Sequence, residues 1–331
     1  MVSADQAFAG RSVLITGGLG FIGSNLARRL ADAGAQVTLL DSLLPQFGGN
    51  LFNLAGYEER VRVNIGDLRD EYSINHLVQG QDFIFNLAGQ VSHLDSMHNP
   101  DADLEINCRS QLYLLEACRK HNPAARILYT STRQVYGRPK FLPVTESHPL
   151  EPADINGIHK QAGEWYHVLY HRIYGLHTTS LRLTNTYGPR MRVVDARQTF
   201  LGLWLRQILN HEPLTIYGDG QQKRDFNYVD DVVEALLRVA VTPATEGQIY
   251  NLGATDPVSL LDLARQLLSF AGTGSYQLVP FPAERKPIDI GDYFADFTKI
   301  RTAIGWQPAV SLVEGLPRAL DYYRVHHKHY W

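Results

Sequence analysis

The chain has 331 residues, of which 44% are apolar and 20% are charged, and its formal net charge is −3. A chain of this length exceeds what one hydrophobic core usually supports, so we expect one large domain with a second, smaller lobe. The net charge is too small to gather nucleic acid or anionic lipid, and no apolar run approaches the ~20 residues of a membrane span. We therefore expect no nucleic-acid partner and no membrane partner.

The N-terminal stretch and the cysteines bear on the cellular compartment. Residues 1–10 lack the basic start and the apolar run of a secretory signal. The chain has two cysteines, Cys108 and Cys118, which are too few for a disulfide framework. Both fall in one stretch of helical periodicity, where packed helix residues are a better interpretation than a redox pair. These features predict a reduced, cytoplasmic protein.

The N-terminal half alternates short β-branched runs with stretches of helical periodicity. The expected strands are, in chain order, residues 12–16, 36–40, 61–64, 83–86, 126–130 and 178–183. Long helices are expected over residues 102–120 and 157–174. This alternation is typical of βαβ units and predicts a doubly wound parallel sheet, with its ligand crevice at the carboxyl ends of the strands.

The alternation loosens after about residue 185, where Gly and Pro punctuate shorter elements. We predict a first domain over residues 1–184 that contains this sheet and its ligand crevice, and a smaller lobe made mainly of residues 185–331, with the chain free to cross between them. The terminal run VHHKHYW (325–331) could chelate a metal, but a solvated terminus is the better interpretation. We expect no metal site.

The stretch ITGGLGFIGSN follows the first expected strand and opens the first expected helix. Gly17, Gly20 and Gly23 therefore fall where a tight turn, a close backbone approach and close helix packing exclude a side chain. A pyrophosphate at the helix N-terminus is the implied ligand. Asp41 ends the second strand, where a carboxylate binds ribose hydroxyls and would repel a 2′-phosphate, so the sequence favours NAD over NADP.

Several further motifs occur in order along nearly the whole chain. They are GDLRD (66–70), FNLAGQ (85–90), STRQVYG (131–137), LRLTNTYGPRM (181–191), YGDGQQKRDFNYVDDVV (217–233) and ADFTKIRTAIGWQP (295–308). With the Gly-rich motif, they make the chain resemble the extended short-chain dehydrogenase/reductase family, in its nucleotide-sugar epimerase and dehydratase branch. The resemblance implies a Rossmann fold, NAD, a nucleotide-diphosphate sugar substrate and a homodimer.

The resemblance also implies site residues. The cofactor-binding residues are Gly17, Gly20, Phe21, Ile22, Gly23, Asp41, Asp67, Leu68, Asn86, Leu87, Ala88, Gly89 and Lys160. Asp67 and Leu68 would border the adenine, and Lys160 would hold the nicotinamide ribose. The substrate-binding residues are Gln90, Ser92, His93, Arg133, Asn185, Arg224 and Arg285. Asn185, Arg224 and Arg285 match positions that grip the diphosphate, and Thr132 would hydrogen-bond the sugar oxygen that is oxidised.

The chain departs from the family at NGIHK (156–160). The family carries a tyrosine four residues before the lysine, and that phenol acts as general base while hydride leaves the sugar. Asn156 stands in its place; it can hydrogen-bond but cannot take the proton. Lys160, His159 and His93 are the candidate substitutes, and Lys160 comes first because the match already places it at the reacting end.

A second departure lies in STRQVYG (131–137). The dehydratases of the family have an acidic pair where this chain has Arg133 and Gln134, and the uronate decarboxylases have a glutamate at the second position. Because eliminating water needs a positioned acid and base, dehydration is disfavoured. Arg133 could pair with an anionic substrate group such as a uronate carboxylate, or could equally be a structural salt-bridge partner.

Three functions remain open on these residues. The first is an NAD-dependent epimerase, or related redox enzyme, that acts on a nucleotide sugar through a transient keto-sugar with Thr132, Lys160 and Asn156 at the reacting carbon. The second is a non-catalytic protein that binds NAD and a nucleotide sugar. The third is a reductase of a non-nucleotide small molecule, which would leave Arg224 and Arg285 without a phosphate to bind.

Overall fold

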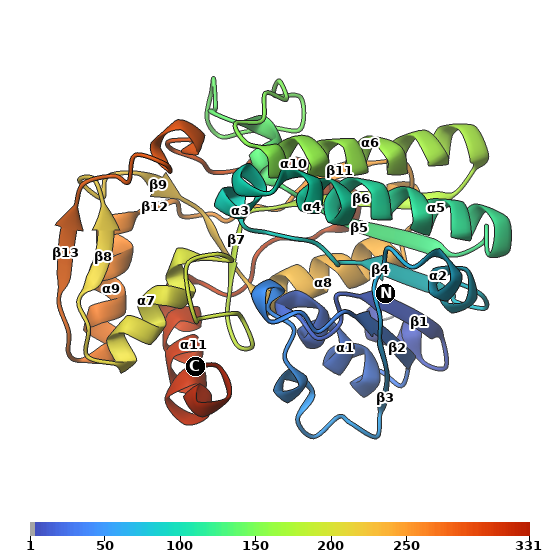
Figure 1. The fold of residues 1–331 in the computed structure, drawn as a ribbon, viewed down its shortest axis with the longest axis horizontal. Helices are drawn as coiled ribbons and strands as arrows, with labels where there is room; N and C mark the ends of the chain where they lie inside the picture. Colours follow the sequence, from blue (N-terminus) through green and yellow to red (C-terminus); the bar gives the residue numbers. More distant parts are fainter. Residues whose placement is uncertain (1–3) are drawn as a thin grey trace.

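A computed structural model describes residues 4–331; residues 1–3, part of the stretch inspected for a secretory signal, lie outside the described range. The main sheet has seven parallel strands in the order β11-β6-β5-β4-β1-β2-β3 (Figure 1). The strands are β1 (Ser12–Thr16), β2 (Gln36–Asp41), β3 (Val61–Ile65), β4 (Phe83–Asn86), β5 (Arg126–Thr132), β6 (His177–Leu183) and β11 (Ile249–Asn251). The predicted doubly wound sheet is confirmed.

The strand order reverses at β1, which pairs with β2 on one side and with β4 on the other. Thr16 lies opposite Leu40 of β2 and opposite Asn86 of β4. The segments that follow Thr16, Asp41 and Asn86 therefore leave the same edge of the sheet side by side. This switch point is where doubly wound folds bind their ligands.

Helices cover both faces of the sheet (Figure 1). One face is covered by α1 (Phe21–Asp32) and α8 (Val229–Ala240), and the other by α2 (Glu71–Leu77), α5 (Ser110–His121) and α6 (Ile155–Tyr174). Both faces of the strands are thus buried, which explains why the strands read as nearly continuous apolar runs. Within residues 4–331, none of the helices has both the length and the hydropathy of a bilayer span.

The predicted helix over 102–120 is interrupted. The structure has α3 (His93–His98), α4 (Pro100–Leu104), a π-helical turn (Glu105–Arg109) and then α5. A π-turn inserts one extra residue per turn and often marks a functional site. Here the turn carries Asn107, whose side chain is fully buried and faces the start of α6.

The seventh strand, β11, is the one that sequence periodicity does not indicate. It follows α8, so the chain returns from the second lobe to complete the sheet beside β6. The carboxyl-terminal half therefore contributes a helix and an edge strand to the first domain.

The second lobe lies beside the carboxyl edge of the sheet (Figure 1). Its strands form three two-stranded sheets, and its helices enclose a separate apolar core that includes Trp204, Leu263 and Leu316. The elements are β7 (Asn185–Tyr187), α7 (Phe200–Leu209), β8 (Leu214–Tyr217), β9 (Lys223–Arg224), β10 (Phe226–Tyr228), β12 (Val258–Ser259), α9 (Leu260–Ala271), β13 (Tyr276–Val279) and α11 (Leu312–His326). Helix α10 (Thr298–Ile304) instead packs beside β11, with Ile300 in the core of the first domain.

The C-terminal residues are not a solvated tail, and that expectation is wrong. Tyr330 is 7% exposed, and its hydroxyl donates to Asn53 Oδ1 at 2.7 Å. The His329 ring stacks on Phe52 with 3.6 Å between ring centroids. The end of the chain is packed against the loop that follows β2, because its two aromatic rings find apolar and polar partners there.

Candidate active site

A large cleft opens at the carboxyl edge of the sheet, and most of the predicted site residues line it. Those in its wall are Gly17, Gly20, Phe21, Ile22, Gly23, Asp41, Asp67, Leu68, Leu87, Ala88, Gly89, Gln90, His93, Thr132, Arg133, Asn156, Lys160, Asn185 and Arg285. Ser92 and Arg224 line an adjoining pocket, which shares His93, Arg133 and Arg285 with the cleft. Residues predicted from six separate strand ends thus meet in one place.

The Gly-rich turn leaves no room for side chains. Gly17 has φ +68°, and a Cβ there would lie 2.9 Å from the Ala88 backbone. A Cβ on Gly23 would lie within 3.0 Å of the backbone of Gly17 and Gly18. Helix α1 begins at Phe21, so its N-terminal amides face the cleft at the position of an anionic ligand.

Asp41, at the end of β2, is hydrogen-bonded to this turn. Its Oδ2 accepts from the Leu19 amide and its Oδ1 from the Leu43 amide, each at 2.9 Å. Burial raises the pKa of this carboxyl above its usual range. Asp67 lies farther along the cleft and is paired with Arg69 at 2.6 Å, and the hydrogen bond from that guanidinium lowers the pKa of Asp67.

Asn86 differs from its predicted place. Its side chain is fully buried beneath the cleft rather than in its wall. It accepts from Thr16 Oγ1 at 2.9 Å and donates to Gln111 Oε1 at 2.5 Å. Because Thr16 Oγ1 in turn accepts from the Ala88 amide at 3.1 Å, Asn86 fixes the Leu87–Gly89 backbone and does not itself reach a ligand.

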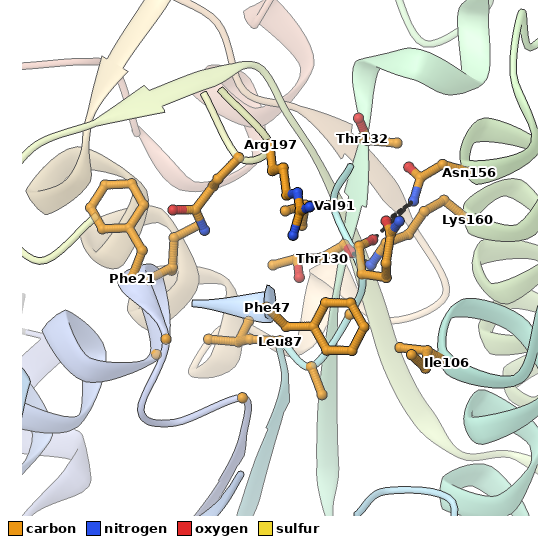
Figure 2. Close-up of a pocket in the computed structure, with 18 of the residues that line it drawn as sticks. Phe21, Phe47, Leu87, Val91, Ile106, Thr130, Thr132, Asn156, Lys160 and Arg197 are labelled. Carbon is orange, nitrogen blue, oxygen red and sulfur yellow. Dashed lines mark hydrogen bonds between the residues drawn. The ribbon is translucent and has the colours of Figure 1, made fainter. Parts of the chain in front are cut away.

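Three residues of the predicted reaction centre share one wall of the cleft. Figure 2 shows Thr132, Asn156 and Lys160 together, opposite Phe21, with the side chain of Arg197 entering between the two walls. Thr132 ends β5 and caps a short 3₁₀ turn by accepting from the Gln134 amide at 3.2 Å. Its hydroxyl hydrogen therefore stays available to donate to a ligand oxygen.

Asn156 is held in one orientation by a buried network. Its Nδ2 donates to the Gln90 carbonyl at 2.9 Å and to Asp103 Oδ2 at 3.1 Å. Asn107 donates from its own Nδ2 to the same two acceptors, at 2.9 and 3.0 Å. Because two acceptors hold the amide nitrogen, the Asn156 Oδ1 is turned toward the cleft as a hydrogen-bond acceptor.

Lys160 is buried on the same helix, one turn after Asn156. Its Nζ donates to the Thr130 carbonyl at 3.2 Å (Figure 2). Burial lowers its pKa to about 8, against a partial opposing effect of Asp103. The neutral amine, which can accept a proton, is therefore a larger minority of this lysine near pH 7 than it would be of an exposed lysine.

The two candidate histidines differ in their access to the cleft. His159 Nδ1 lies 2.7 Å from Asp103 Oδ1, and His159 is not among the residues that line the cleft. His93 does line it, and its Nδ1 lies 3.0 Å from Asp154 Oδ2. Asp154 also accepts from Gln134 Nε2 at 2.7 Å and caps α6. His93 is thus oriented by a carboxylate that also positions the helix of Lys160.

The pocket beside the reaction centre is basic. Arg224 is 6% exposed and donates to the carbonyls of Lys223 and Gly291, with Asp289 at 3.5 Å. Arg285 lies 5.8 Å from the ring centroid of Tyr217. Asn185 donates to the Asp225 carbonyl at 3.0 Å, and Ser92 caps α3. Two arginines at one end of a cleft suit a diphosphate.

Sequence reasoning missed two residues of the site. Asp103 holds Asn156 and His159 but stands in a helical stretch with no motif around it. Arg197 lines the cleft from the loop before α7 and is paired with Asp95 at 3.4 Å. The spacing of Asp103 and Asn107, one helical turn apart, was the available signal for the first, and the sequence offers none for the second.

Comparison with known proteins agrees with this geometry. The model of the NAD dependent epimerase/dehydratase family matches residues 13–253. The chain is 31% identical to a putative UDP-glucose 4-epimerase of Methanocaldococcus jannaschii, over 94% of this chain and 97% of the relative.

Solved structures give the same result. The fold superposes with a TM-score of 0.92 on an epimerase of Methanothermobacter thermautotrophicus, at 27% identity and over 98% of this chain and 95% of that one. The TM-score is 0.88 for a dTDP-glucose 4,6-dehydratase of Streptomyces venezuelae solved with NAD, at 30% identity over 97% and 98% of the two chains. With its Gly-rich turn, Asp41 and Lys160 around one cleft, the chain belongs to the NAD-dependent epimerase/dehydratase family.

Proposed function

We propose that this protein epimerises the sugar of a nucleotide-diphosphate sugar through a transient keto-sugar, with a general base other than tyrosine. The observation that carries the proposal is the shared wall of Thr132, Asn156 and Lys160, between a dinucleotide end and a basic end of one cleft. Burial lowers the pKa of Lys160 to about 8, which supports a role in proton transfer in addition to a role at the nicotinamide ribose.

The residues of the Gly-rich end fit NAD. The backbone cradle around Gly17 and Gly23 would be filled by any Cβ, and Asp41 offers a carboxylate rather than a cation at the ribose position. Lys160 would hold the nicotinamide ribose. When bound, NAD takes a hydride from the sugar carbon and returns it.

The protein side chains then have distinct roles. Thr132 donates its hydroxyl hydrogen to the sugar oxygen at the reacting carbon, which polarises the developing carbonyl. Asn156 Oδ1 accepts from a neighbouring hydroxyl of the sugar and so orients the ring, because its Nδ2 is held by Gln90 and Asp103. The neutral Lys160 amine takes the hydroxyl proton and later gives it back to the same oxygen. His93, held by Asp154, is the alternative base.

The proposal is tested by incubating the protein and NAD with UDP-, dTDP-, GDP- and CDP-sugars, including uronates, and following products by proton NMR. A new isomer that keeps its carbon-bound hydrogen in heavy water is the expected result. Lys160→Met should abolish the isomer, whereas His93→Gln should leave measurable turnover. Tight binding of NAD and a nucleotide sugar without any isomer would instead support the non-catalytic protein. Turnover that Arg224→Met leaves unchanged would support a substrate without a diphosphate.

We also propose that the chain forms a homodimer through α6. Ile158, Trp165, Leu169 and Ile173 are between 47% and 64% exposed and recur on one face of this helix. A row of large apolar side chains in water is unfavourable unless a partner covers it. Trp165→Glu should convert a dimer to a monomer in light scattering after gel filtration, whereas Tyr72→Glu, an 89% exposed control on α2, should not.

A further inference from the structure

Arg133 follows Thr132 directly in the chain and lines both the cleft and the adjoining basic pocket. Its Nε is buried and has no hydrogen-bond partner, and no carboxylate within residues 4–331 forms an ion pair with it. Burial lowers the pKa of this guanidinium, although it stays charged. The guanidinium lies 5.9 Å from the ring centroid of Tyr293, and its unused, buried Nε donor beside a ligand cleft is unfavourable unless an acceptor arrives there.

The carboxylates around Arg133 have other partners. Asp154 accepts from Gln134 and the Gly157 amide, each at 2.7 Å. Asp225 accepts from Thr184 and from the Ala295 amide. Asp289 accepts from Gln222 at 2.8 Å. These carboxylates maintain the local fold and do not pair with the guanidinium, so a structural salt bridge does not account for Arg133.

The diphosphate of the proposed substrate is one dianionic group, and three arginines besides Arg133 line the basic pocket. Of these, Arg197 is paired with Asp95 at 3.4 Å, which leaves two for the diphosphate. Arg224 and Arg285 lie in the basic pocket with Asp289 as the carboxylate among its lining residues. Burial and then the positive charge of Arg133 lower the pKa of Arg224 to about 10. The basic groups therefore exceed what a diphosphate requires, and the extra cation is the one nearest in sequence to Thr132, at the sugar end.

We propose, on the basis of the proposed function, that the sugar of the substrate carries a carboxylate and that Arg133 receives it. For hydride transfer at C4 of the sugar, a hexuronate carries its carboxylate on the neighbouring carbon, C5, beside the oxygen that Thr132 would polarise. The planar guanidinium offers Nε and a neighbouring NH group, which match the two carboxylate oxygens. Gln134 gives neither an acid nor a base to this group, which agrees with recognition of the carboxylate rather than reaction at it.

The test is a binding experiment on the full chain with NAD. Affinities are measured by calorimetry for the uronate and neutral forms of the same sugar linked to UDP, dTDP, GDP or CDP, and for each free nucleoside diphosphate. We expect one uronate to bind at least about tenfold more tightly than its neutral counterpart. Arg133→Met should remove that preference while changing affinity for the nucleoside diphosphate less than about threefold. Arg133→Lys should restore part of the preference, since it keeps the charge but loses the planar fork.

Arg138→Met is the matched control, because this arginine lies in the same segment but is exposed and absent from both pockets. Absence of any uronate preference in the wild-type protein overturns the inference. So does an equal loss of nucleoside-diphosphate affinity in Arg133→Met, which would make Arg133 a third phosphate ligand. Binding separates this inference from the proposed function: a uronate preference without isomer formation would refute the epimerase alone, and isomerised neutral sugars without a preference would refute only the carboxylate.

Discussion

Lys160 is 6% exposed and donates one hydrogen bond, to the Thr130 carbonyl. Its ammonium form is disfavoured there, so its pKa is lowered from 10.5 to about 8. A lowered lysine pKa means that the unfolded chain binds more protons between about pH 8 and pH 10.5. Burial of Lys160 therefore lowers the free energy of unfolding, and this destabilisation has its full size below about pH 8. It disappears as the pH rises toward 10.5.

Lys160→Met should accordingly stabilise the protein without NAD by on the order of 2–3 kcal/mol at pH 7, with the gain vanishing near pH 10.5. The measurement is the unfolding free energy of both proteins from pH 6 to 10.5. Lys120→Met, at an exposed lysine of α5, should show no such dependence. A gain that does not change with pH would mean that Lys160 is not the titrating group.

In the wild-type enzyme, kcat/KM should rise as the pH passes through about 8, because the neutral amine is the active form.

Asn156 gives a second residue-scale prediction. Asn156→Asp keeps the shape but replaces the amide nitrogen with an acceptor that faces the Gln90 carbonyl and Asp103. We expect a loss of about 2–4 kcal/mol at pH 7, from two lost donors and a like charge. The new carboxyl has a raised pKa, so the loss should shrink as the pH falls toward 4. If the variant is as stable as the wild type at pH 7, the amide nitrogen does not face Asp103, and the role given to Asn156 Oδ1 is wrong.

Helix α6 is fixed to the sheet by a buried ion pair. Glu164 of α6 is fully buried and accepts from Arg182 Nε of β6 at 2.9 Å. Arg182 also donates to the Tyr136 hydroxyl at 2.7 Å, and Tyr136 donates to Asn251 of β11 at 2.6 Å. This network joins the helix of Lys160 to two strands and to the turn after Thr132, and so sets their spacing.

Glu164→Met should reduce stability by about 3–5 kcal/mol, because it leaves the Arg182 charge buried and unpaired, and Arg182→Met should do the same by leaving the Glu164 charge unpaired. The double variant Glu164→Met with Arg182→Met should lose much less, since no charge then remains. Urea unfolding of the two single variants and the double variant measures the coupling between the two positions. Additive losses would show that the pair does not act as one unit.

How far the sequence predicts each element depends on how local its signal is. The Gly-rich turn was predictable because the backbone of one short segment requires glycine. Asp41 was predictable because it ends the strand that follows this turn and its helix. Strand β11 was not, because it has three residues and owes its place to pairing with β6. The Asp103 network was missed because Gln90, Asp103 and Asn156 come from three segments that only the fold brings together. Asn86 is buried where its side chain hydrogen-bonds to Gln111, and no motif in the sequence indicates this contact.

In the whole molecule, the C-terminal residues connect the two lobes. Asn50 donates from its Nδ2 to the His329 carbonyl at 2.9 Å, and Asn53 accepts from the Tyr330 hydroxyl. Asn53 in turn donates to the Leu19 carbonyl at 2.9 Å, and the Leu19 amide donates to Asp41. A continuous set of contacts thus runs from the last turn of the chain to the Gly-rich turn and the Asp41 carboxylate.

Tyr330→Phe removes the hydroxyl at the centre of this set and leaves Asn53 Oδ1 and the Tyr322 hydroxyl without a shared partner. We expect a stability loss of about 1–2 kcal/mol and weaker NAD binding, by about threefold to tenfold, with unchanged affinity for the nucleoside diphosphate. Tyr322→Phe is the control, because it removes the contact to Tyr330 and leaves the bond to Asn53 in place. Calorimetry with each ligand separates the two effects. Equal NAD affinity in both variants and in the wild type would mean that the C-terminal residues stabilise the fold without supporting the cofactor end of the cleft.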